Sequence, residues 1–411
     1  MNRLVLSILF FVFYLFSGAQ TVNGRIVYQE GSLTTVKVWG THKERGYAYG
    51  YLMADKILEV HNKFIKPSFG SHYDAVKKII IDEVHIKIDK IYHEEALAMV
   101  EGMNAKGVDV SDFDYIDILL GNSYLDILGL NRGNFISGCS TLMSWGEATK
   151  SSELSGNTIV TRHLDWQPYD PLINNQVLVI HVPSEEDEQP WLSLGFAGHM
   201  SVLSGVNENG LCVFQHDLND PLQGTTKVGV QYEPVWFTMR KAIEKKDYNN
   251  DGRNNVKDVK DAIRKNVWGY VDGYIICAIA GNEEPSDSLT AMVAELTPGS
   301  PYVTFRSTEC EDGLEGDNLY AANGAVARNN KHNYDKRYQD VSKAVGKGEK
   351  IGAEKSWKIM KEKSTSTNPN VHFMQIIPET GELKISVYEN KIQAFEMEPV
   401  TYSIYEFFKK E

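Results

Sequence analysis

Apolar and polar positions follow a helical period along the first third of the chain. From Thr41 to about Ile65, small and apolar residues recur on one face, which predicts a long helix that opens at Thr41. Residues 35–39 before it alternate as a strand does, and further helical regions are expected over 75–103 and 113–128. The first third is therefore predicted to be mostly helical.

After Gly138 the pattern changes to short runs with a period of two, separated by Gly, Asn, Pro or Asp. Strands are predicted at 139–145, 158–163, 176–181, 191–196, 211–216, 274–280, 290–296, 302–307, 371–376 and 383–388. Helices are predicted at 234–246, 256–268 and 353–363. No repeat or abrupt boundary divides the chain, so we expect one α+β domain of two stacked antiparallel sheets flanked by helices.

The N-terminal residues carry the pattern of an export signal. Arg3 precedes an apolar run over 4–16, broken only by one serine, and small residues follow up to Ala19. The run of 13 residues is shorter than the roughly 20 that span a bilayer. We therefore predict a signal peptide over 1–19 and a secreted or periplasmic mature protein without a stable membrane anchor.

Composition bounds the class of protein. The chain has 411 residues, of which 42% are hydrophobic and 24% charged, enough to bury a large core. The formal net charge of -13 comes without a basic stripe, which excludes nucleic acid as a partner. We find no phosphate-binding Gly-rich loop and no redox or zinc pattern, so no organic cofactor is expected. Nothing in the sequence fixes the oligomeric state.

Four cysteines follow the predicted signal peptide, at Cys139, Cys212, Cys277 and Cys310. They form no C-x-x-C pair and no Cys/His cluster with zinc spacing. Two disulfides are possible in an oxidising compartment, but at most one can form if one cysteine must stay a free thiol. Whether Cys212, Cys277 and Cys310 contribute to such a disulfide stays open.

The junction Gly138-Cys139 has the features that a self-cleaving bond requires. Gly138 allows strained backbone angles, and the thiol of Cys139 can attack the carbonyl that precedes it. Cleavage would free an α-amino group with a reference pKa of about 7.7 to 8.0, a competent base near neutral pH. Nucleophile and base would then belong to one residue. The alternative is a buried structural cysteine after a turn.

Arg162 and Asp165 lie on the strand predicted to pair with the Cys139 strand. Period-two alternation places Arg162 on one face of that strand. A guanidinium beside the thiol would favour the thiolate, and a carboxylate could hold the α-amine in position. An ordinary Arg/Asp surface ion pair is the alternative interpretation.

The sequence G-C-S-T at residues 138–141, followed by R-x-x-D at residues 162–165, resembles the cysteine N-terminal-nucleophile (Ntn) hydrolases. These include acid ceramidase, N-acylethanolamine acid amidase, choloylglycine hydrolases and the penicillin acyltransferases. Residues 45–50 (RGYAYG), 196–211 and 321–324 (AANG), the last followed by Arg337, are similar to the family in order and spacing. The likeness covers most of residues 35–390. It implies a four-layer αββα sandwich.

The resemblance also implies roles for single residues. Cys139 would be nucleophile and base, Arg162 and Asp165 would position and polarise it, Asn323 would donate to the oxyanion, and Arg337 would hold the site together. Asp217 falls near a position where relatives contact the amine or the substrate, and His216 beside it is a second substrate-binding candidate.

By the same resemblance, cleavage between Gly138 and Cys139 would leave a helical segment, 20–138, and a catalytic β-rich segment, 139–411, within one domain. The reaction implied is cleavage of the amide bond of a small N-acylated molecule through an acyl-cysteine, with water or a second amine as acceptor.

Residues 247–258 (DYNNDGRNNVKD) have the ligand pattern of a calcium loop. Oxygen ligands stand at loop positions 1, 3, 5, 9 and 12, Gly stands at position 6, and a backbone carbonyl is available at position 7. The ligands are Asp247, Asn249, Asp251, Arg253 (carbonyl), Asn255 and Asp258. The loop resembles EF-hand loops of the dockerin type, and we expect a structural Ca²⁺. A polar turn between two helices is the alternative.

The sequence is also compatible with two other functions. One is a cysteine peptidase-like hydrolase that pairs Cys139 with a separate histidine, such as His163 or His216, without self-cleavage. The other is a non-catalytic, calcium-dependent surface binding protein in which the loop 247–258 is the functional part.

Overall fold

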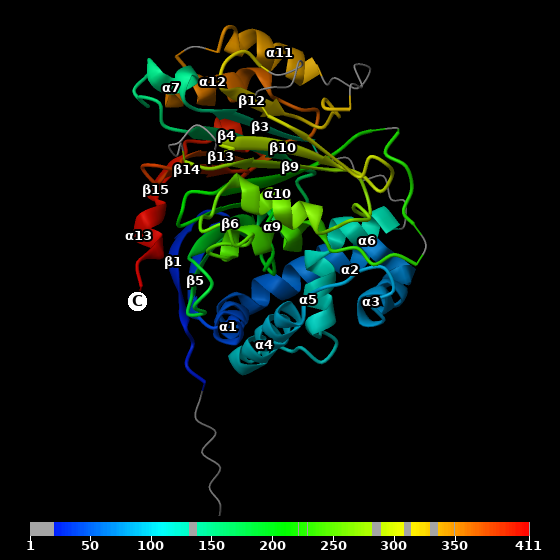
Figure 1. Ribbon diagram of the computed structural model, residues 1–411. Coiled ribbons are helices and arrows are strands. Elements are labelled where there is room, and N and C mark those ends of the chain that lie inside the picture. The colour runs from blue at the N-terminus through cyan, green and yellow to red at the C-terminus, as the bar shows by residue number, and fades with distance from the viewer. Residues whose placement is uncertain are drawn as a thin grey trace, which may run out of the picture.

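The computed structural model describes residues 20–130, 138–220, 222–227, 229–281, 289–307, 314–328, 336–348 and 350–410. The predicted signal peptide over 1–19 and Cys310 lie outside the described residues. Four layers are stacked, with helices, a sheet, a second sheet and helices in succession (Figure 1). The expected α+β sandwich of two stacked sheets flanked by helices is therefore confirmed.

The larger sheet has nine strands, listed here in spatial order. They are β1 (Gly24–Glu30), β2 (Leu33–Gly40), β5 (Gln176–Pro183), β6 (Trp191–Phe196), β7 (Ser204–Asn207), β8 (Cys212–Asp217), β9 (Tyr274–Ile279), β10 (Ala291–Leu296) and β11 (Val303–Arg306). All neighbours are antiparallel except β2 and β5, which run parallel. The chain between them crosses the helical layer and two strands of the other sheet, so no hairpin joins them. The larger sheet is thus mixed, where the sequence predicted antiparallel pairing.

The smaller sheet has six strands and is antiparallel throughout. Its spatial order is β12 (Asn318–Ala321), β3 (Gly138–Ser144), β4 (Ile159–Asp165), β13 (Asn370–Ile377), β14 (Glu382–Val387) and β15 (Val400–Ser403). The hairpin of β3 and β4 carries Cys139 and Arg162, so the centre of this sheet supports the candidate site.

Helices cover the outer faces of both sheets (Figure 1). On the larger sheet these are α1 (His42–Val60), α2 (Lys66–Phe69), α3 (Tyr73–Ile81), α4 (Lys90–Lys106), α5 (Tyr115–Asn122), α6 (Tyr124–Leu130), α9 (Val235–Glu244) and α10 (Val256–Arg264). On the smaller sheet they are α11 (Lys336–Val345) and α12 (Ala353–Lys363). The short helices are α7 (Glu147–Lys150), α8 (Asp170–Ile173) and α13 (Ile404–Phe408).

Three apolar layers hold these elements together. One lies between the first helical layer and the larger sheet and includes Met99, Val179 and Phe237. A second lies between the two sheets, and a third lies beneath α11 and α12. Because β2 precedes Gly138 and pairs with β5, which follows it, the segments before and after the predicted cleavage point share one sheet.

Some predicted elements differ from the structure. The helix expected over 75–103 is interrupted between α3 and α4, where Ile86 forms a bridge with Tyr232 and Glu83 has a φ of +46°. β1 was not predicted because most of its residues are exposed and give no alternation. The unpredicted strands β7, β12 and β15 have only four residues each, too few for a period of two to be recognised.

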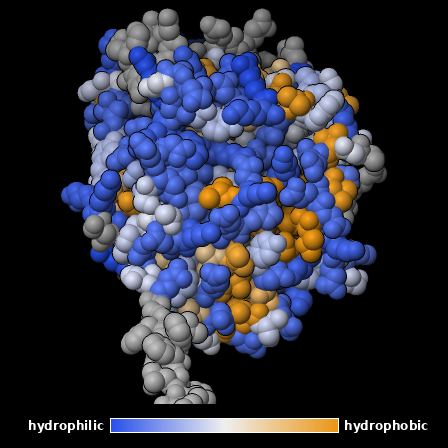
Figure 2. Space-filling view, turned by 60° about the horizontal axis from the view of Figure 1, so that its bottom comes forward, coloured by the Kyte–Doolittle hydropathy of each residue, from blue (hydrophilic) through white to orange (hydrophobic). Residues whose placement is uncertain are grey.

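The surface is mostly hydrophilic in the view of Figure 2, with apolar side chains gathered toward its lower part. Exposed large apolar residues of the first helical layer include Ile81, Val84, Ile91 and Leu97. Within the described part of the chain, no helix combines the length and apolar character needed to cross a bilayer.

Candidate active site

Cys139 is the second residue of β3 and is buried, with 1% of its surface exposed. Strand pairing places it opposite Leu164 of β4, while Gly138 lies opposite Asp165. The side chains of β3 alternate between its two faces. Ser140 faces Ser364 below α12, and Thr141 faces His216 of the larger sheet. Cys139 shares the face of Thr141, so its thiol points between the two sheets.

Two residues hold the backbone of Cys139. Its N–H donates to Oδ1 of Asn323 at 3.0 Å, and its carbonyl accepts from Nη1 of Arg337 at 3.2 Å. Asn323 also donates from Nδ2 to the carbonyl of Asp217 at 2.7 Å. The nitrogen that would become the free amine is therefore fixed before any cleavage. In this uncleaved chain the Asn323 amide donates to Asp217, and its role as oxyanion donor stays a prediction.

Arg162 connects the two sheets beside Cys139. It projects from β4 and reaches the larger sheet, where Nη2 donates to the carbonyl of Gln215 at 2.7 Å and Nε to Oγ of Ser204 at 3.4 Å. Arg162 is buried, with 1% of its surface exposed. Charges act more strongly in such a water-poor interior than at the surface. Arg162 therefore supplies a fixed positive charge close to Cys139.

Asp165 lies at the end of β4, on the opposite strand face from Arg162. Its Oδ1 accepts from Nδ2 of Asn370 at 2.8 Å, and its Oδ2 lies 3.7 Å from Nη1 of Arg337. Arg337 thus contacts Asp165, Asn323 and the carbonyl of Cys139 from its position on α11. This arrangement connects the outer helical layer to Cys139.

The charges around Cys139 shift the pKa of its thiol in opposite directions. Burial raises the pKa of the thiol above its usual value, and the Arg162 guanidinium opposes this shift. The carboxylates of Asp217 and Asp165 add to the upward shift. The thiol is therefore mostly protonated at neutral pH in the uncleaved chain. A new α-ammonium on Cys139 would favour the thiolate.

Asp217 and His216 have different surroundings although they are adjacent. Asp217 ends β8, and its Oδ1 accepts from Nε2 of Gln215 at 3.0 Å. His216 points into the space between the sheets, where Nε2 lies 2.8 Å from Oγ1 of Thr141 and Nδ1 lies 2.9 Å from the carbonyl of Ala322. Burial lowers the pKa of His216 well below its usual value, so its ring is neutral.

The structure thus brings Cys139, Arg162, Asp165, Asn323, Arg337 and Asp217 together around one backbone segment. His216 packs beside this group against Thr141 and the Cys277 thiol. Sequence reasoning missed Gln215, Ser204 and Asn370, which bond to Asp217, Arg162 and Asp165. For Gln215 a signal existed, because it stands two positions before Asp217 and shares its strand face.

Neither of the histidines proposed for a peptidase-like mechanism makes a hydrogen bond to Cys139 among those the structure records in its described part. His163 faces the outer side of β4, where its ring packs edge-on against Phe373 at 4.4 Å. Burial lowers the pKa of His163 to about 3. The arrangement therefore gives no support to a separate histidine base.

The three described cysteines, Cys139, Cys212 and Cys277, are buried and form no disulfide with one another. Cys310 lies outside the described residues, so its pairing stays open.

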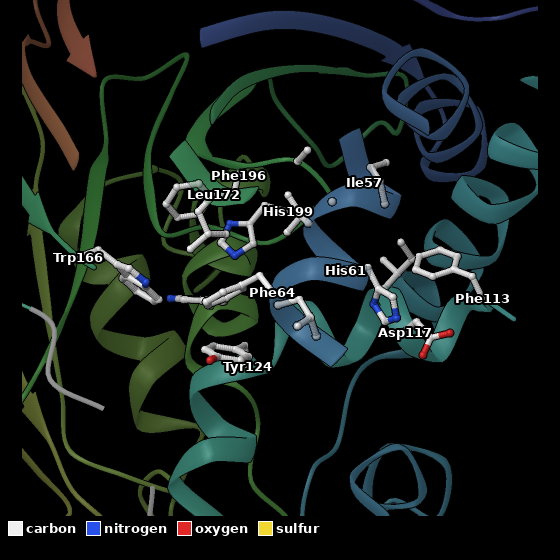
Figure 3. A pocket seen from close by; sticks show the side chains of 17 residues that line it. Ile57, His61, Phe64, Phe113, Asp117, Tyr124, Trp166, Leu172, Phe196 and His199 are labelled. Atoms are coloured by element: carbon white, nitrogen blue, oxygen red, sulfur yellow. The ribbon is translucent and has the colours of Figure 1, made fainter. Parts of the chain in front are cut away.

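An apolar pocket opens between the helical layer and the ends of the sheets (Figure 3). Its lining residues come from α1 and the short π-helix His61–Ile65 after it, from α5, α6, α8 and α9, and from the ends of β4 and β6. They are Ile57, Val60, His61, Phe64, Ile65, Phe113, Asp117, Ile118, Gly121, Tyr124, Trp166, Leu172, Phe196, Ala197, Gly198, His199 and Trp236. Both predicted segments, before and after Cys139, therefore contribute to its wall.

The pocket begins next to the residues gathered around Cys139 and ends on polar side chains. Trp166 directly follows Asp165, and Trp236 donates from its indole N–H to Oε1 of Gln215 at 3.1 Å. Figure 3 shows Trp166 at one end and His61 and Asp117 at the other. The predominantly apolar lining suits the acyl part of a ligand.

The loop over 247–258 connects α9 and α10, as the sequence predicted. Asp247 accepts from the backbone N–H of Asp251 at 3.0 Å and of Gly252 at 2.8 Å, and Gly252 has a φ of +89°. These bonds fold the first half of the loop around the Asp247 carboxylate. Asp258 accepts from the N–H of Tyr248 at 2.7 Å and of Asn255 at 2.7 Å. The donor set and the loop closure fit a cation-binding loop, although both Asp258 oxygens are engaged by the backbone here.

No protein-family model matches the chain. Protein dcd1B of Dictyostelium discoideum is 25% identical over 208 residues, which are 47% of this chain and 41% of that protein. The chain thus spans about two fifths of the length of the curated relative it matches.

Several solved structures share part of the architecture. A Caenorhabditis elegans ortholog of N-acylethanolamine-hydrolyzing acid amidase matches with a TM-score of 0.40 and 14% identity, over 58% of this chain and 93% of that one. Conjugated bile acid hydrolase from Clostridium perfringens matches with a TM-score of 0.37 and 13% identity, over 66% and 95%. Penicillin V acylase from Agrobacterium tumefaciens matches with a TM-score of 0.38 and 9% identity, over 61% and 83%. At such low similarity, the activity of this chain has to be argued from its own site.

Proposed function

We propose that the chain is an exported Ntn amidohydrolase that cleaves itself before Cys139 and then cleaves the amide bond of a small N-acylated molecule. The observation that carries this proposal is the pair of hydrogen bonds that fix the backbone of Cys139. Its backbone nitrogen is bonded to Asn323 and its carbonyl to Arg337, while the charge of Arg162 acts on its thiol. Buried backbone groups always need partners, but here both partners are polar side chains rather than a neighbouring strand.

Self-cleavage uses groups of the chain itself. The Cys139 sulfur attacks the Gly138 carbonyl carbon, the C–N bond breaks, and the Cys139 nitrogen takes up the thiol proton. Water then hydrolyses the thioester, which leaves a Gly138 carboxylate, a free thiol and a free α-amine. Asn323 Oδ1 already contacts this nitrogen at 3.0 Å, so it can hold the new amine as a base beside the thiol.

The same groups serve the reaction on an external amide. The thiolate of Cys139 attacks the carbonyl, the α-ammonium protonates the leaving amine, and water or a second amine releases the acyl group. The apolar pocket that begins at Trp166 and Trp236 would hold the acyl part. The substrate proposed is therefore an amide with an apolar acyl group.

The first experiment is intact-mass measurement and N-terminal sequencing of the purified protein, with Cys139→Ala and Cys212→Ala. Cys212 is an equally buried thiol in β8, and it serves as the matched control. We expect a fragment that begins at Cys139 in the wild type and in Cys212→Ala, and an intact chain in Cys139→Ala. An intact wild-type chain that nevertheless hydrolyses amides would rule out the free-amine mechanism.

Export is part of the proposal and can be read in the same experiment. The apolar run and the small residues up to Ala19 support a cleaved signal peptide. The N-terminal fragment should then begin near Gln20 when the chain is expressed with an export pathway. A fragment that still carries residues 1–19 would contradict secretion by this route.

We further propose that residues 247–258 hold a structural Ca²⁺. The ligand pattern, the left-handed Gly252 at position 6 and the helices on both sides support this assignment. Asp247, Asn249, Asp251, the Arg253 carbonyl, Asn255 and Asp258 would supply the oxygens. The ion would fix the connection of α9 to α10, which positions Trp236 in the pocket wall.

A further inference from the structure

Gln215 occupies the junction between the apolar pocket and the charges around Cys139. It is a β8 residue with 2% of its surface exposed. Its side-chain amide donates to Oδ1 of Asp217 at 3.0 Å and accepts from the indole of Trp236 at 3.1 Å. Its backbone carbonyl accepts from Arg162 at 2.7 Å. One residue therefore contacts the pocket wall and both charged groups that face the nucleophile from this side.

The chemistry of these contacts requires an amide. A carboxylate needs a donor and an indole N–H needs an acceptor, and Gln215 provides both on one rigid plane. An ionised glutamate would accept from Trp236 but could not donate to Asp217. A leucine would remove the hydrogen bonds of Gln215 to both Asp217 and Trp236. The amide thus fixes the distance between Asp217 and the Trp236 ring.

This fixed distance connects binding to reactivity. Trp236 lines the pocket, and the ring of His199 packs edge-on against it at 4.5 Å. The carboxylate of Asp217 and the guanidinium of Arg162 act in opposite directions on the charge of the Cys139 thiol. A ligand that moves the indole therefore moves a carboxylate close to the nucleophile through a single side chain.

We propose that Gln215 is a positioning residue that couples the acyl pocket to Cys139 by holding Trp236, Asp217 and Arg162 in one arrangement. The assignment of a reaction to the site rests on the proposed function, but the coupling itself is a property of the fold. Gln215 touches neither the thiol nor the scissile bond in the bonds described, so it acts through these three neighbours.

The test compares Gln215→Glu with Gln375→Glu. Gln375 is also 2% exposed and lies in β13, where it donates to Thr161 and to the carbonyl of Ala353 under α12. The same substitution at Gln375 introduces the same buried carboxylate away from the site. Melting temperature measures the structural cost of each variant.

The decisive readout is the rate at which iodoacetamide alkylates Cys139 as a function of pH, followed by peptide mass. In Gln215→Glu the two adjacent carboxyl groups share a proton at low pH, and the protonated glutamate can donate to Asp217 as the amide does. We expect alkylation rates near those of the wild type at acid pH. At higher pH we expect the alkylation profile to move up by about one pH unit, so that the rate at a fixed pH falls about tenfold. Gln375→Glu should keep the wild-type profile.

Acyl selectivity is the second readout, with decanoyl and phenylacetyl 4-nitroanilides as probes. We expect Gln215→Glu to change the ratio of their kcat/KM values by about tenfold, while Gln375→Glu leaves the ratio unchanged. A folded Gln215→Glu protein with an unchanged alkylation profile, or an equal shift in Gln375→Glu, would overturn the inference. Absence of a fragment that begins at Cys139 would instead contradict the proposed function, and alkylation would still report on Gln215.

Discussion

Arg337 and Asn323 are joined by a hydrogen bond of 2.6 Å, and it ends on the same Oδ1 atom that accepts the backbone N–H of Cys139. This oxygen is therefore shared between a cation from the outer helical layer and the nitrogen of the proposed scissile bond. A hydrogen bond from a charged guanidinium is stronger than one between neutral groups, so Arg337 holds the Asn323 amide in place. The pair fixes the peptide that would be cleaved.

Replacement of Asn323 by leucine should slow self-cleavage strongly. The change removes the acceptor for Cys139 and leaves the Arg337 guanidinium without a partner on that side, with an expected loss of about 10² to 10³ in rate. The fraction of intact chain against time, measured by mass, gives the effect. Asn318→Leu is the control, because Asn318 is a buried asparagine of β12 that bonds to Ser144 and not to Cys139. Equal self-cleavage rates in both variants would contradict the role assigned to Asn323.

Arg162→Gln should raise the pKa of the Cys139 thiol further. Burial already raises it, and the guanidinium is the group that opposes this shift. Without that charge, alkylation of Cys139 should move to higher pH, and at a fixed neutral pH it should slow about tenfold. Arg306→Gln is a comparison variant, because Arg306 is a buried arginine of β11 that donates to the carbonyl of Tyr320. A profile that does not move would show that Arg162 has no influence on the thiolate.

Much of the site could be read from the sequence because its residues belong to local patterns. Cys139 follows a glycine at the point where the hydrophobic period changes from helical to two. Strand alternation alone places Arg162 and Asp165 on opposite faces of their strand. The contacts made by Asn323 and Arg337 could not be derived in this way, since they join residues 184 and 198 positions apart. Only the resemblance pointed to them. Gln215 was missed because its partners, Trp236 and Arg162, come from a helix and from the other sheet.

Calcium should stabilise the protein, and the effect should depend on the loop over 247–258. A ligand that binds only the folded state at about 100 times its Kd adds about 2.7 kcal/mol to the free energy of unfolding. We expect the melting temperature to rise on addition of CaCl₂ and to fall again with a chelator. Asp247→Ala should abolish the response, whereas Asp112→Asn, an exposed residue outside the loop, should retain it. An identical response in Asp247→Ala would place calcium elsewhere.

A buried charge network connects the segments on the two sides of the proposed cleavage point. His42 on α1 bonds through Nδ1 to Glu95 on α4 at 2.5 Å and through Nε2 to Glu188 at 2.8 Å. Arg240 on α9 bonds to Glu95 at 2.6 Å. Glu188 and Arg240 follow Cys139, while His42 and Glu95 precede it. After cleavage these ion pairs would hold two separate chains together.

Protonation of His42 should therefore control stability. Burial alone would lower the pKa of His42, but its hydrogen bonds to Glu188 and Glu95 outweigh burial and raise the pKa to about 9. A folded pKa above the unfolded value of about 6.5 means that the contribution is complete below pH 6.5 and is lost as the pH rises through about 9. The melting temperature of the wild type should fall across this window.

His42→Gln should remove that dependence, because glutamine keeps hydrogen-bonding groups but carries no proton to lose. The lost charge leaves Glu95 and Glu188 less compensated, and breaking a buried pair costs about 3 to 5 kcal/mol. The variant should therefore unfold at a lower temperature below pH 6.5 and approach the wild type near pH 9. His72→Gln, an exposed histidine of the same helical layer, should follow the wild-type curve. If His42→Gln and the wild type stay parallel across the whole range, His42 is not the titrating group, and the slope has to come from another residue.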